Sequence, residues 1–511
     1  MTNEAVPCPV VIAGAGPVGL MAACELASAG IPVLVLERRS QPDRILKAGS
    51  VGPLAIEALD RLGLRAELAE AEEATMAGYA KMAEEARAAG DQVAVDALDK
   101  AQREHFAGLE KLDFARRSDP ARRRMRVPQP ALVEILRRRA GQLGVTVLTA
   151  HEVVGLTQDD EGVTVVADTP RGRRELRTAY LLGCDGGSSA VRRLAGFGFP
   201  GTAATMLGRQ GVVELADPAQ LPAGIHEVEH GILVWGLGVD RVAALEFSPE
   251  STELGPITRE ELHTAVARVS GIDLGITEFK AGGRFNDEAR LAADYRSGRV
   301  LLAGDAAHIH APVGGQGLNV GLIDAVNIAW KLAARLRGWT GDDLLDTYGA
   351  ERRPVAEALL DNTRAQIALM RPDSHSRALR RLFAEILELD EVNLFIGDLM
   401  AGLDTRYEFG DADPLVGTLC PDVKLPGPVE RLAALPHDGR GVLLWQGGQP
   451  PAFVTRWAER VRVVTGGTGE TGAEALLLRP DACVAWVARP GVPADLAALE
   501  TALGTWFGVP A

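Results

Sequence analysis

A glycine-rich turn between two apolar runs near the N-terminus is the feature that most constrains the fold. Residues 9–13 read P-V-V-I-A, residues 14–19 read G-A-G-P-V-G, and residues 33–36 read V-L-V-L directly before Glu37. Residues 20–29 lie between the turn and the second run and predict a helix. A G-x-G-x-x-G turn in the order strand, turn, helix and strand predicts a parallel α/β sheet that binds a dinucleotide.

The positions of this turn each have a physical role in holding a dinucleotide. Gly14 permits the tight turn, Gly16 lets the backbone approach a pyrophosphate, and Gly19 allows close packing of helix on strand. The N-terminus of the predicted helix supplies N–H groups that favour phosphate, and Glu37 is placed to accept ribose hydroxyls. The alternative is a purely structural turn, and the flanking strands and the acid argue against it. The turn does not distinguish FAD from NAD.

Two further glycine-rich motifs follow predicted strands. Residues 180–189 read Y-L-L-G-C-D-G-G-S-S and place Asp185 in an acidic turn. Residues 298–319 read G-R-V-L-L-A-G-D-A-A-H-I-H-A-P-V-G-G-Q-G-L-N, where the strand at 300–303 delivers Asp305 at its carboxyl end. A glycine-rich loop and a helix from about 318 to 336 come next. This arrangement sets a carboxylate for ribityl or ribose hydroxyls beside N–H groups that meet anionic oxygens.

These three motifs in this order resemble the class A flavoprotein monooxygenases of the para-hydroxybenzoate hydroxylase type. The matching elements are the turn at 14–19, Cys184-Asp185-Gly186, Gly304-Asp305-Ala306-Ala307-His308 and the block from Pro312 to Asn319. The resemblance covers residues 1 to about 370 and extends more loosely to the rest. It implies non-covalently bound FAD, reduction by NADPH or NADH, and a flavin C4a-hydroperoxide that hydroxylates an electron-rich aromatic ring with oxygen from O₂.

The resemblance also implies roles for individual residues. Gly14, Gly16 and Glu37 would hold the ADP half, and Asp305 the ribityl or pyrophosphate region. Pro312 would flank the face of the flavin that reacts with oxygen and is expected to be catalytic. The cofactor-binding residues expected in full are Gly14, Gly16, Pro17, Gly19, Glu37, Arg38, Gln129, Asp185, Asp305, Pro312, Gly315, Gly317, Leu318 and Asn319.

The family places an arginine after the ribose acid and a glutamine before a helix near residue 130. Arg38 and Arg44 are candidates for the arginine; Arg44 is also a candidate catalytic residue, and a solvated loop cation is an equal alternative for it. Gln129 matches the glutamine because it opens a predicted helix over 131–142. Many relatives have a histidine–x–arginine segment after Arg44, whereas this chain has I-L-K-A-G-S, so the role of Lys47 stays open.

The chain divides into four parts. Residues 1–199 are the first part of the FAD-binding domain, with a helical insertion at about 65–117. Residues 200–283 contain alternating runs that predict an inserted antiparallel-sheet substrate domain. Residues 284–395 complete the FAD-binding domain with long helices. Residues 400–511 resemble the thioredoxin-like tail of the larger aromatic hydroxylases. The expected fold is therefore α/β plus α+β, built on a Rossmann-like FAD domain of the GR2 type.

The substrate domain and the tail carry weaker functional signals. Trp235 and Phe247 are candidate walls of an apolar substrate pocket, although core packing is the favoured role for either aromatic ring taken singly. The tail has no C-x-x-C, so it cannot perform dithiol exchange and is interpreted as a structural or dimerisation module, with a homodimer as one expected form. His308 and His310 form H-x-H without a third ligand and predict loop structure, so no metal is expected.

Charge and cysteine content exclude other classes of protein. The 54 Lys and Arg against 69 Asp and Glu give a net charge of −15, which disfavours broad binding to nucleic acid or anionic membranes. Arg122–Arg124 is then expected to be a solvated basic face. The five cysteines are widely spaced, there is no signal peptide pattern at the N-terminus, and no apolar run has the length of a membrane span. A cytoplasmic location is expected.

The function that these observations favour is an FAD- and NAD(P)H-dependent monooxygenase acting on a polycyclic aromatic polyketide, a phenol or a quinone. The substrate class rests on similarity of overall layout to aromatic polyketide hydroxylases. One alternative is Baeyer–Villiger insertion, ring opening or rearrangement on the same flavin platform, because the motifs indicate the cofactor and not the fate of the oxygen. A more distant alternative is a non-catalytic scaffold that keeps the flavin fold.

Overall fold

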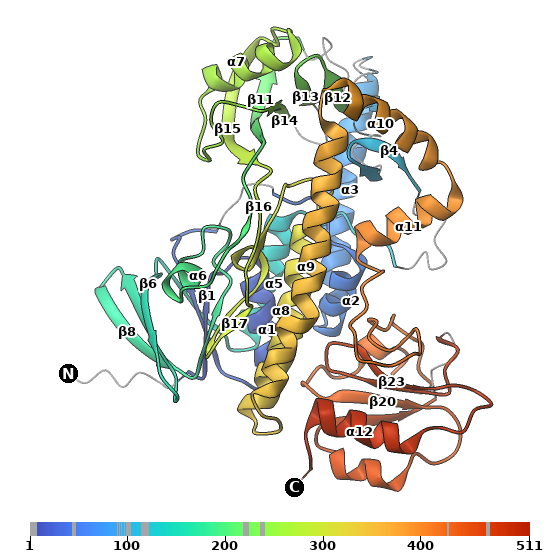
Figure 1. The fold of residues 1–511 in the computed structure, drawn as a ribbon. Helices are drawn as coiled ribbons and strands as arrows, with labels where there is room; N and C mark the ends of the chain where they lie inside the picture. Colours follow the sequence, from blue (N-terminus) through green and yellow to red (C-terminus); the bar gives the residue numbers. More distant parts are fainter. Residues whose placement is uncertain are drawn as a thin grey trace.

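The structure is a computed structural model in which a long helix, α9 (Asp343–Met370), runs past three groups of elements (Figure 1). It describes residues 8–42, 47–88, 90, 92, 95–96, 98, 104–113, 122–217, 224–235, 241–426, 429–466 and 471–510. Among these residues, no helix has the length and apolar character needed to cross a membrane.

A six-stranded sheet lies at the centre of the N-terminal part. Its strands are β17 (Arg296–Ser297), β18 (Val300–Leu302), β9 (Tyr180–Gly183), β1 (Val10–Ala13), β2 (Val33–Glu37) and β5 (Thr146–Thr149), in that order across the sheet. All neighbours are parallel except β17 and β18. The three strands that precede the glycine-rich motifs, β1, β9 and β18, are neighbours, so their carboxyl ends meet at one edge. This edge is where an open α/β sheet binds its ligand.

Helices and small sheets pack around this central sheet. Helix α1 (Pro17–Ser28) contacts both α5 (Gln129–Gln142) and α8 (Gly317–Leu336), close to the bounds that the sequence predicts. The remaining nearby elements are α2 (Pro53–Arg61), α6 (Ala190–Leu194), the sheet of β6 (Glu152–Gln158), β7 (Val163–Thr169) and β8 (Gly172–Thr178), and the sheet of β10 (Gly201–Thr202), β16 (Ala289–Leu291) and β19 (His308–Ile309).

The insertion expected to be helical at 65–117 is only partly helical. Helix α3 (Arg65–Ala88) is followed by an antiparallel hairpin of β3 (Glu104–Phe106) and β4 (Leu109–Leu112). Ala107 and Gly108 form the turn with φ of 51° and 78°. Two successive positive φ angles give the turn type that joins hairpin strands, which a helix does not accommodate. Residues 114–117 of the expected helix lie outside the described residues.

The expected antiparallel substrate domain is a five-stranded sheet covered on one face by α7 (Arg259–Ser270) (Figure 1). Its strands, in order across the sheet, are β12 (Gly224–Val228), β13 (Gly231–Trp235), β14 (Arg241–Phe247), β11 (Met206–Leu215) and β15 (Ile276–Asn286). Side chains along each strand alternate between the α7 face and the face toward the rest of the molecule.

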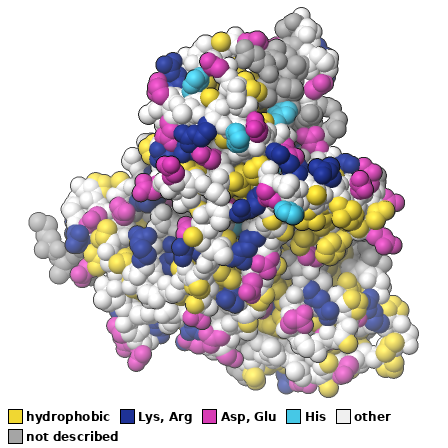
Figure 2. Space-filling view, turned by 45° about the horizontal axis from the view of Figure 1, so that its top comes forward, with side chains coloured by type: hydrophobic (Ala, Val, Ile, Leu, Met, Phe, Trp, Pro, Cys, Tyr) yellow, Lys and Arg dark blue, Asp and Glu magenta, His cyan; other side chains and the backbone are white. Residues whose placement is uncertain are grey.

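The long helices expected within residues 284–395 include an interrupted stretch after α8. Helix α9 ends at Met370, and α10 (Ser374–Ile386) and α11 (Asp390–Ala401) follow. Arg371 is extended because it precedes Pro372, and the Asp373 carboxylate then caps α10 by accepting hydrogen bonds from the N–H groups of His375 and Ser376. Helices α10 and α11 pack against the hairpin on one side. Their exposed apolar residues are Leu379, Leu382, Ile386, Leu389 and Phe395. Figure 2 shows a hydrophobic area at the right of the molecule.

The C-terminal part is a four-stranded sheet with one long helix. The strand order is β21 (Val461–Thr465), β20 (Gly441–Trp445), β22 (Ala475–Leu478) and β23 (Val484–Ala488), followed by α12 (Leu496–Phe507). This part docks on α8 and α9 through buried charges. Arg479 donates two hydrogen bonds of 2.8 Å to the carboxylate of Glu351 on α9, and Lys331 on α8 lies 2.9 Å from the same carboxylate.

Candidate active site

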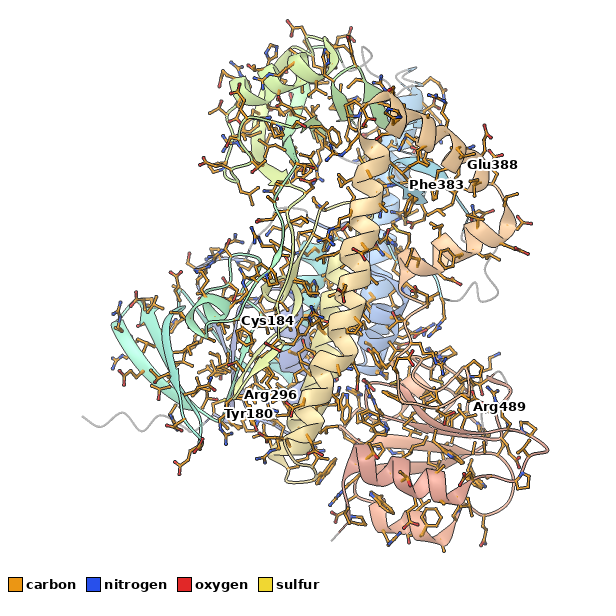
Figure 3. The ribbon with its side chains drawn as sticks, viewed as in Figure 1. Tyr180, Cys184, Arg296, Phe383, Glu388 and Arg489 are labelled. Carbon is orange, nitrogen blue, oxygen red and sulfur yellow. The ribbon has the colours of Figure 1, made fainter. Side chains whose placement is uncertain are left out.

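The glycine turn after β1 forms a cradle at the N-terminus of α1. Gly14 has a φ of +104°, and a Cβ there would lie 2.4 Å from the carbonyl oxygen of Cys184 at the end of β9, labelled in Figure 3. A Cβ on Gly19 would lie 2.0 Å from the carbonyl oxygen of Gly14, whereas a Cβ on Gly16 would meet no atom of the described residues within 4 Å. Gly14 and Gly19 therefore pack against protein, and Gly16 faces open space.

Helix α1 begins at this open space without a side-chain cap and with Pro17 in its first turn. Its first N–H groups are therefore available to an anion, and the helix dipole adds a positive partial charge. These features fit a pyrophosphate, as the sequence predicts.

Glu37 lies at the carboxyl end of β2, beside the same turn. Its carboxylate accepts hydrogen bonds of 2.8 Å from the backbone N–H groups of Ala15 and Arg39. These bonds fix the carboxylate and leave further lone pairs on both oxygens for ribose hydroxyls. Arg38 is exposed next to it. Arg44, the other candidate arginine, lies outside the described residues.

The two aspartates of the later motifs have different surroundings. The Asp185 carboxylate accepts hydrogen bonds from the Ser189 hydroxyl at 2.5 Å, the Ala190 N–H at 2.7 Å and the Val191 N–H at 3.1 Å. It therefore holds the N-terminus of α6. Asp305 is exposed in the turn after β18, and its carboxylate makes no hydrogen bond or ion pair with the part of the chain that the structure describes. An oriented carboxylate of this kind fits the hydroxyls of a ribityl chain or ribose.

A buried ionic network holds the turn that carries Asp305. The Asp324 carboxylate accepts from the Gly304 N–H at 3.1 Å and from Arg352 Nε at 2.7 Å, and it bonds His308 Nε2 at 2.8 Å. Burial alone would raise the pKa of Asp324, but Arg352 and His308 hold it below its ordinary value. His308 of the H-x-H pair is thus bound to a carboxylate. Asp324 and Arg352 were not predicted from the motifs, although a charge within the apolar helix over 318–336 was the signal for Asp324.

Residues 312–319, named here the glycine loop, connect this turn to α8. Pro312 and Gly315 are exposed, and Gly314 and Gly315 have φ of 72° and 62°. Asn319 accepts from the Gly52 N–H at 2.6 Å and donates to the Gly315 carbonyl at 3.2 Å. Asn319 therefore fixes the loop through its side chain. The loop presents its backbone at the same sheet edge as Asp305.

Gly317 and Leu318 form the first turn of α8, and both are only partly buried. The position that a Cβ of Gly317 would take lies 2.4 Å from His310 Nε2, so only glycine fits there without moving the imidazole ring. Gln129 begins α5, and its N–H donates to the Ala48 carbonyl at 2.8 Å.

Arg124 is a residue of the site that the sequence analysis assigned to a solvated face. Its Nη1 lies 3.4 Å from the position that a Cβ of Gly315 would take, and it donates to the Ser50 hydroxyl at 3.3 Å. Only 10% of its side chain is exposed, and burial lowers the pKa of the guanidinium. Arg124 also lines a pocket of about 490 Å³ with Glu72, Glu104 and other residues of α3 and 122–126. Such burial was not visible from a run of three arginines.

The inner face of the five-stranded sheet meets the glycine loop in one apolar cluster. Phe247 and Phe285 from the sheet belong to the same cluster as Val313 of the loop, and all three are only partly buried. Trp235 is different: it is 7% exposed and packs with Leu262 and other residues of α7 on the opposite face. Strand alternation explains this, since Val234 faces inward and its neighbour must face outward. Phe247 thus belongs to the cluster that includes Val313 of the loop, whereas Trp235 does not.

Comparisons with known proteins agree with this geometry. An FAD binding domain model matches residues 7–363, and an aromatic-ring hydroxylase C-terminal model matches residues 413–510. A relative from Streptomyces rimosus subsp. rimosus, named 12-dehydrotetracycline 5-monooxygenase/anhydrotetracycline 6-monooxygenase, is 38% identical over 98% of this chain and 99% of its own. A dialkyldecalin synthase from Streptomyces rugosporus is 36% identical, covering 98% of both chains.

The fold agrees with a solved structure as well. An anhydrotetracycline hydroxylase from Streptomyces rimosus superposes with a TM-score of 0.85 at 38% identity, over 98% of this chain and 99% of that chain. The open cradle at Gly16, the unpaired Asp305 carboxylate and the exposed glycine loop fit FAD. This chain belongs to the class A FAD-dependent monooxygenases, in the group that carries an aromatic-ring hydroxylase C-terminal domain.

Proposed function

We propose that the protein is an FAD- and NAD(P)H-dependent monooxygenase that hydroxylates a polycyclic aromatic polyketide, a phenol or a quinone. The observation that carries the proposal is the apolar cluster to which Phe247 and Phe285 of the sheet and Val313 of the glycine loop all belong. Flat aromatic side chains opposite a flavin loop suit a flat, apolar substrate. The relative that acts on anhydrotetracycline supports a polycyclic substrate.

The chain's own residues would bind and orient the cofactor. Glu37 and Asp305 would accept hydroxyls of the ribose and ribityl groups, and the first turn of α1 would hold the pyrophosphate. Bound FAD, reduced by NADPH or NADH, would supply the activation of O₂ from which one oxygen atom reaches the ring. N–H groups of the glycine loop and the cation of Arg124 would stabilise negative charge in this region.

The substrate side would act mainly by exclusion of water. The residues of the cluster are apolar, so they supply no base for a phenol. A phenolic substrate acidic enough to ionise itself needs none. The apolar wall also keeps water away from the reactive oxygen, which limits its loss as peroxide.

Binding spectra of the FAD-loaded protein test this assignment. Addition of a polycyclic phenol should shift the visible absorption of the flavin, because the ring would lie beside it. The Phe247→Ala variant should need about tenfold more phenol for half the shift, since it loses an aromatic wall. An unchanged requirement would remove Phe247 from the substrate site.

A second candidate function is a ring-forming or rearranging reaction in the same cluster without net oxygen transfer. The similarity to the dialkyldecalin synthase favours this candidate, because the name of that relative specifies no oxidation. Product formation under strictly anaerobic conditions without NAD(P)H would support this candidate. Product formation that requires both O₂ and NAD(P)H would support the monooxygenase.

We also infer a thioredoxin-like fold for the C-terminal part. Its strand order, with β20 parallel to β21 and antiparallel to β22, supports this. Cys420 and Cys483 are buried and free, which fits a structural or dimerisation module rather than a redox centre. Light scattering at several protein concentrations tests the homodimer.

A further inference from the structure

A chain of buried amide side chains connects the glycine loop to the β3–β4 hairpin. Gln316 of the loop donates to the Leu399 carbonyl of α11 at 3.2 Å and accepts from Asn362 Nδ2 on α9 at 3.0 Å. Asn362 Oδ1 accepts in turn from Gln366 Nε2 at 3.2 Å, one turn further along α9. Gln366 Oε1 then accepts from the backbone N–H of Ala107 at 3.1 Å.

These three amides are buried, with exposed fractions of 7% for Gln316, 7% for Asn362 and 0% for Gln366. A buried amide that loses its partner is costly, so each one restricts the orientation of the next. Both Asn362 and Gln366 also lie 3.6 Å from the Met400 sulfur, and this contact limits the room for alternative rotamers.

The far end of the chain is a turn that depends on such support. Ala107 is a non-glycine residue with a φ of 51°, a conformation that an alanine rarely adopts. Arg380 of α10 donates to the Ala107 carbonyl at 2.6 Å, and Phe106 packs on Phe383 of α10, labelled in Figure 3, with 5.3 Å between ring centroids. The turn is therefore held through both the N–H and the carbonyl group of Ala107.

The base of the hairpin approaches the glycine loop by a second route. The Glu104 carboxylate lies 3.6 Å from both Arg124 and Arg126, and Arg124 lies against Gly315. Gly315 is thus linked to the base of the hairpin, and its neighbour Gln316 is linked to the turn of the same hairpin.

We propose that Asn362 and Gln366 are positioning residues that couple FAD binding at the glycine loop to the order of the β3–β4 hairpin. When FAD fixes the loop, the Gln316 amide is held in one orientation. The series of buried amides then holds the hydrogen bond of the Ala107 N–H closed for more of the time. The hairpin adjoins the apolar cluster through Phe106 and Leu109, so the same chain connects cofactor occupancy to the substrate side.

Hydrogen exchange with and without FAD tests the coupling. In the wild-type protein, FAD should slow exchange in the glycine loop and also, by about tenfold, at the Ala107 amide, whose hydrogen bond opens less often. Asn362→Leu has nearly the same shape and cuts the chain in its middle without touching the hairpin. In this variant FAD should still protect the loop but should leave exchange at Ala107 unchanged. Its affinity for FAD should fall by about three- to tenfold.

Asn393→Leu is the matched control. Asn393 is also a buried amide, and it holds the other strand of the hairpin by donating to the Lys111 carbonyl at 2.6 Å and accepting from the Asp113 N–H at 2.9 Å. Asn393 itself makes no hydrogen bond to the glycine loop among the described residues, and Leu399, which accepts from Gln316, lies further along α11. Replacement of Asn393 should speed exchange in the hairpin equally with and without FAD, and the affinity for FAD should stay unchanged.

Two results would overturn the proposal. One is a wild-type protein in which FAD protects the loop but not Ala107; this measurement needs no variant. The other is full FAD-dependent protection of Ala107 in Asn362→Leu. If that variant does not fold, Gln366→Met cuts the chain at the hairpin end and must give the same loss of FAD-dependent protection.

Discussion

At the scale of single residues, Gly16 and Gly19 of the first turn should respond differently to a side chain. Gly16→Val should leave the stability of the apoprotein within about 0.5 kcal/mol, because the space at Gly16 is open, and should weaken FAD binding more than tenfold. Gly19→Ala should lower stability by about 1–3 kcal/mol, since its Cβ would meet the Gly14 carbonyl. Thermal melts of the apoproteins and FAD titrations measure both. Equal FAD affinity in Gly16→Val would contradict the cradle.

Substitutions of the two motif aspartates, Asp185 and Asp305, should also differ in their effects on stability and on FAD binding. Asp305→Asn should weaken FAD binding by about ten- to a hundredfold with little change in apoprotein stability, because this carboxylate has no partner among the described residues. Asp185→Asn should lower stability by about 1–2 kcal/mol, because it weakens the cap of α6. The same titrations and melts apply. Tight FAD binding by Asp305→Asn would show that another group holds the ribityl chain.

At the scale of elements, substitutions on the two faces of the five-stranded sheet should have different effects. Trp235→Ala should destabilise the protein by about 3–5 kcal/mol, because it leaves a cavity under α7. Phe247→Ala, on the partly buried inner face, should be less destabilising and should raise the KM for the aromatic substrate more than it lowers kcat. Melting curves and steady-state kinetics distinguish the two. A KM effect from Trp235→Ala without loss of stability would reverse the assignment of faces.

The elements also show how far the sequence alone predicts the structure. The β1–α1–β2 unit was predictable because its turn, periodicity and acid are all local in the chain. The hairpin at Ala107 was not, because alanine disfavours its φ of 51° and the turn depends on Gln366 and Arg380 from distant helices. Arg124 was assigned to solvent for the same reason: its burial arises from contacts with residues far away in the chain.

At the scale of the whole molecule, buried charges join the C-terminal part to the rest. Arg479 and Asp481 face Glu351 and Lys331, and Arg479 also stacks on aromatic rings, including Trp506 at 4.5 Å from its centroid. Burial alone would raise the pKa of Glu351, but Arg479 and Lys331 hold it at about 2. A folded pKa below the ordinary value of 4.5 means that this carboxylate stabilises the protein above pH 4.5, and that the contribution is lost as the pH falls toward 2.

Glu351→Gln should therefore cost about 3–5 kcal/mol at pH 7, because it leaves an excess of buried positive charge. The difference from wild type should shrink by about 1 kcal/mol at pH 4. Denaturant midpoints at pH 7, 5 and 4 measure it. Glu388→Gln, which breaks an exposed pair with Lys111 near α10 (Figure 3), is the control and should leave stability nearly unchanged at each pH. A difference for Glu351→Gln that does not vary with pH would contradict this role.

In the proposed function, the cofactor, the glycine loop and the inner face of the five-stranded sheet act together on a polycyclic ring. The most direct test is NADPH or NADH consumption by the FAD-loaded protein with a panel of polycyclic phenols, with product masses read from the same samples. We expect one of these phenols to stimulate NADPH or NADH consumption and to yield a product heavier by one oxygen atom. Consumption that yields only peroxide with every phenol, or no consumption at all, would contradict it.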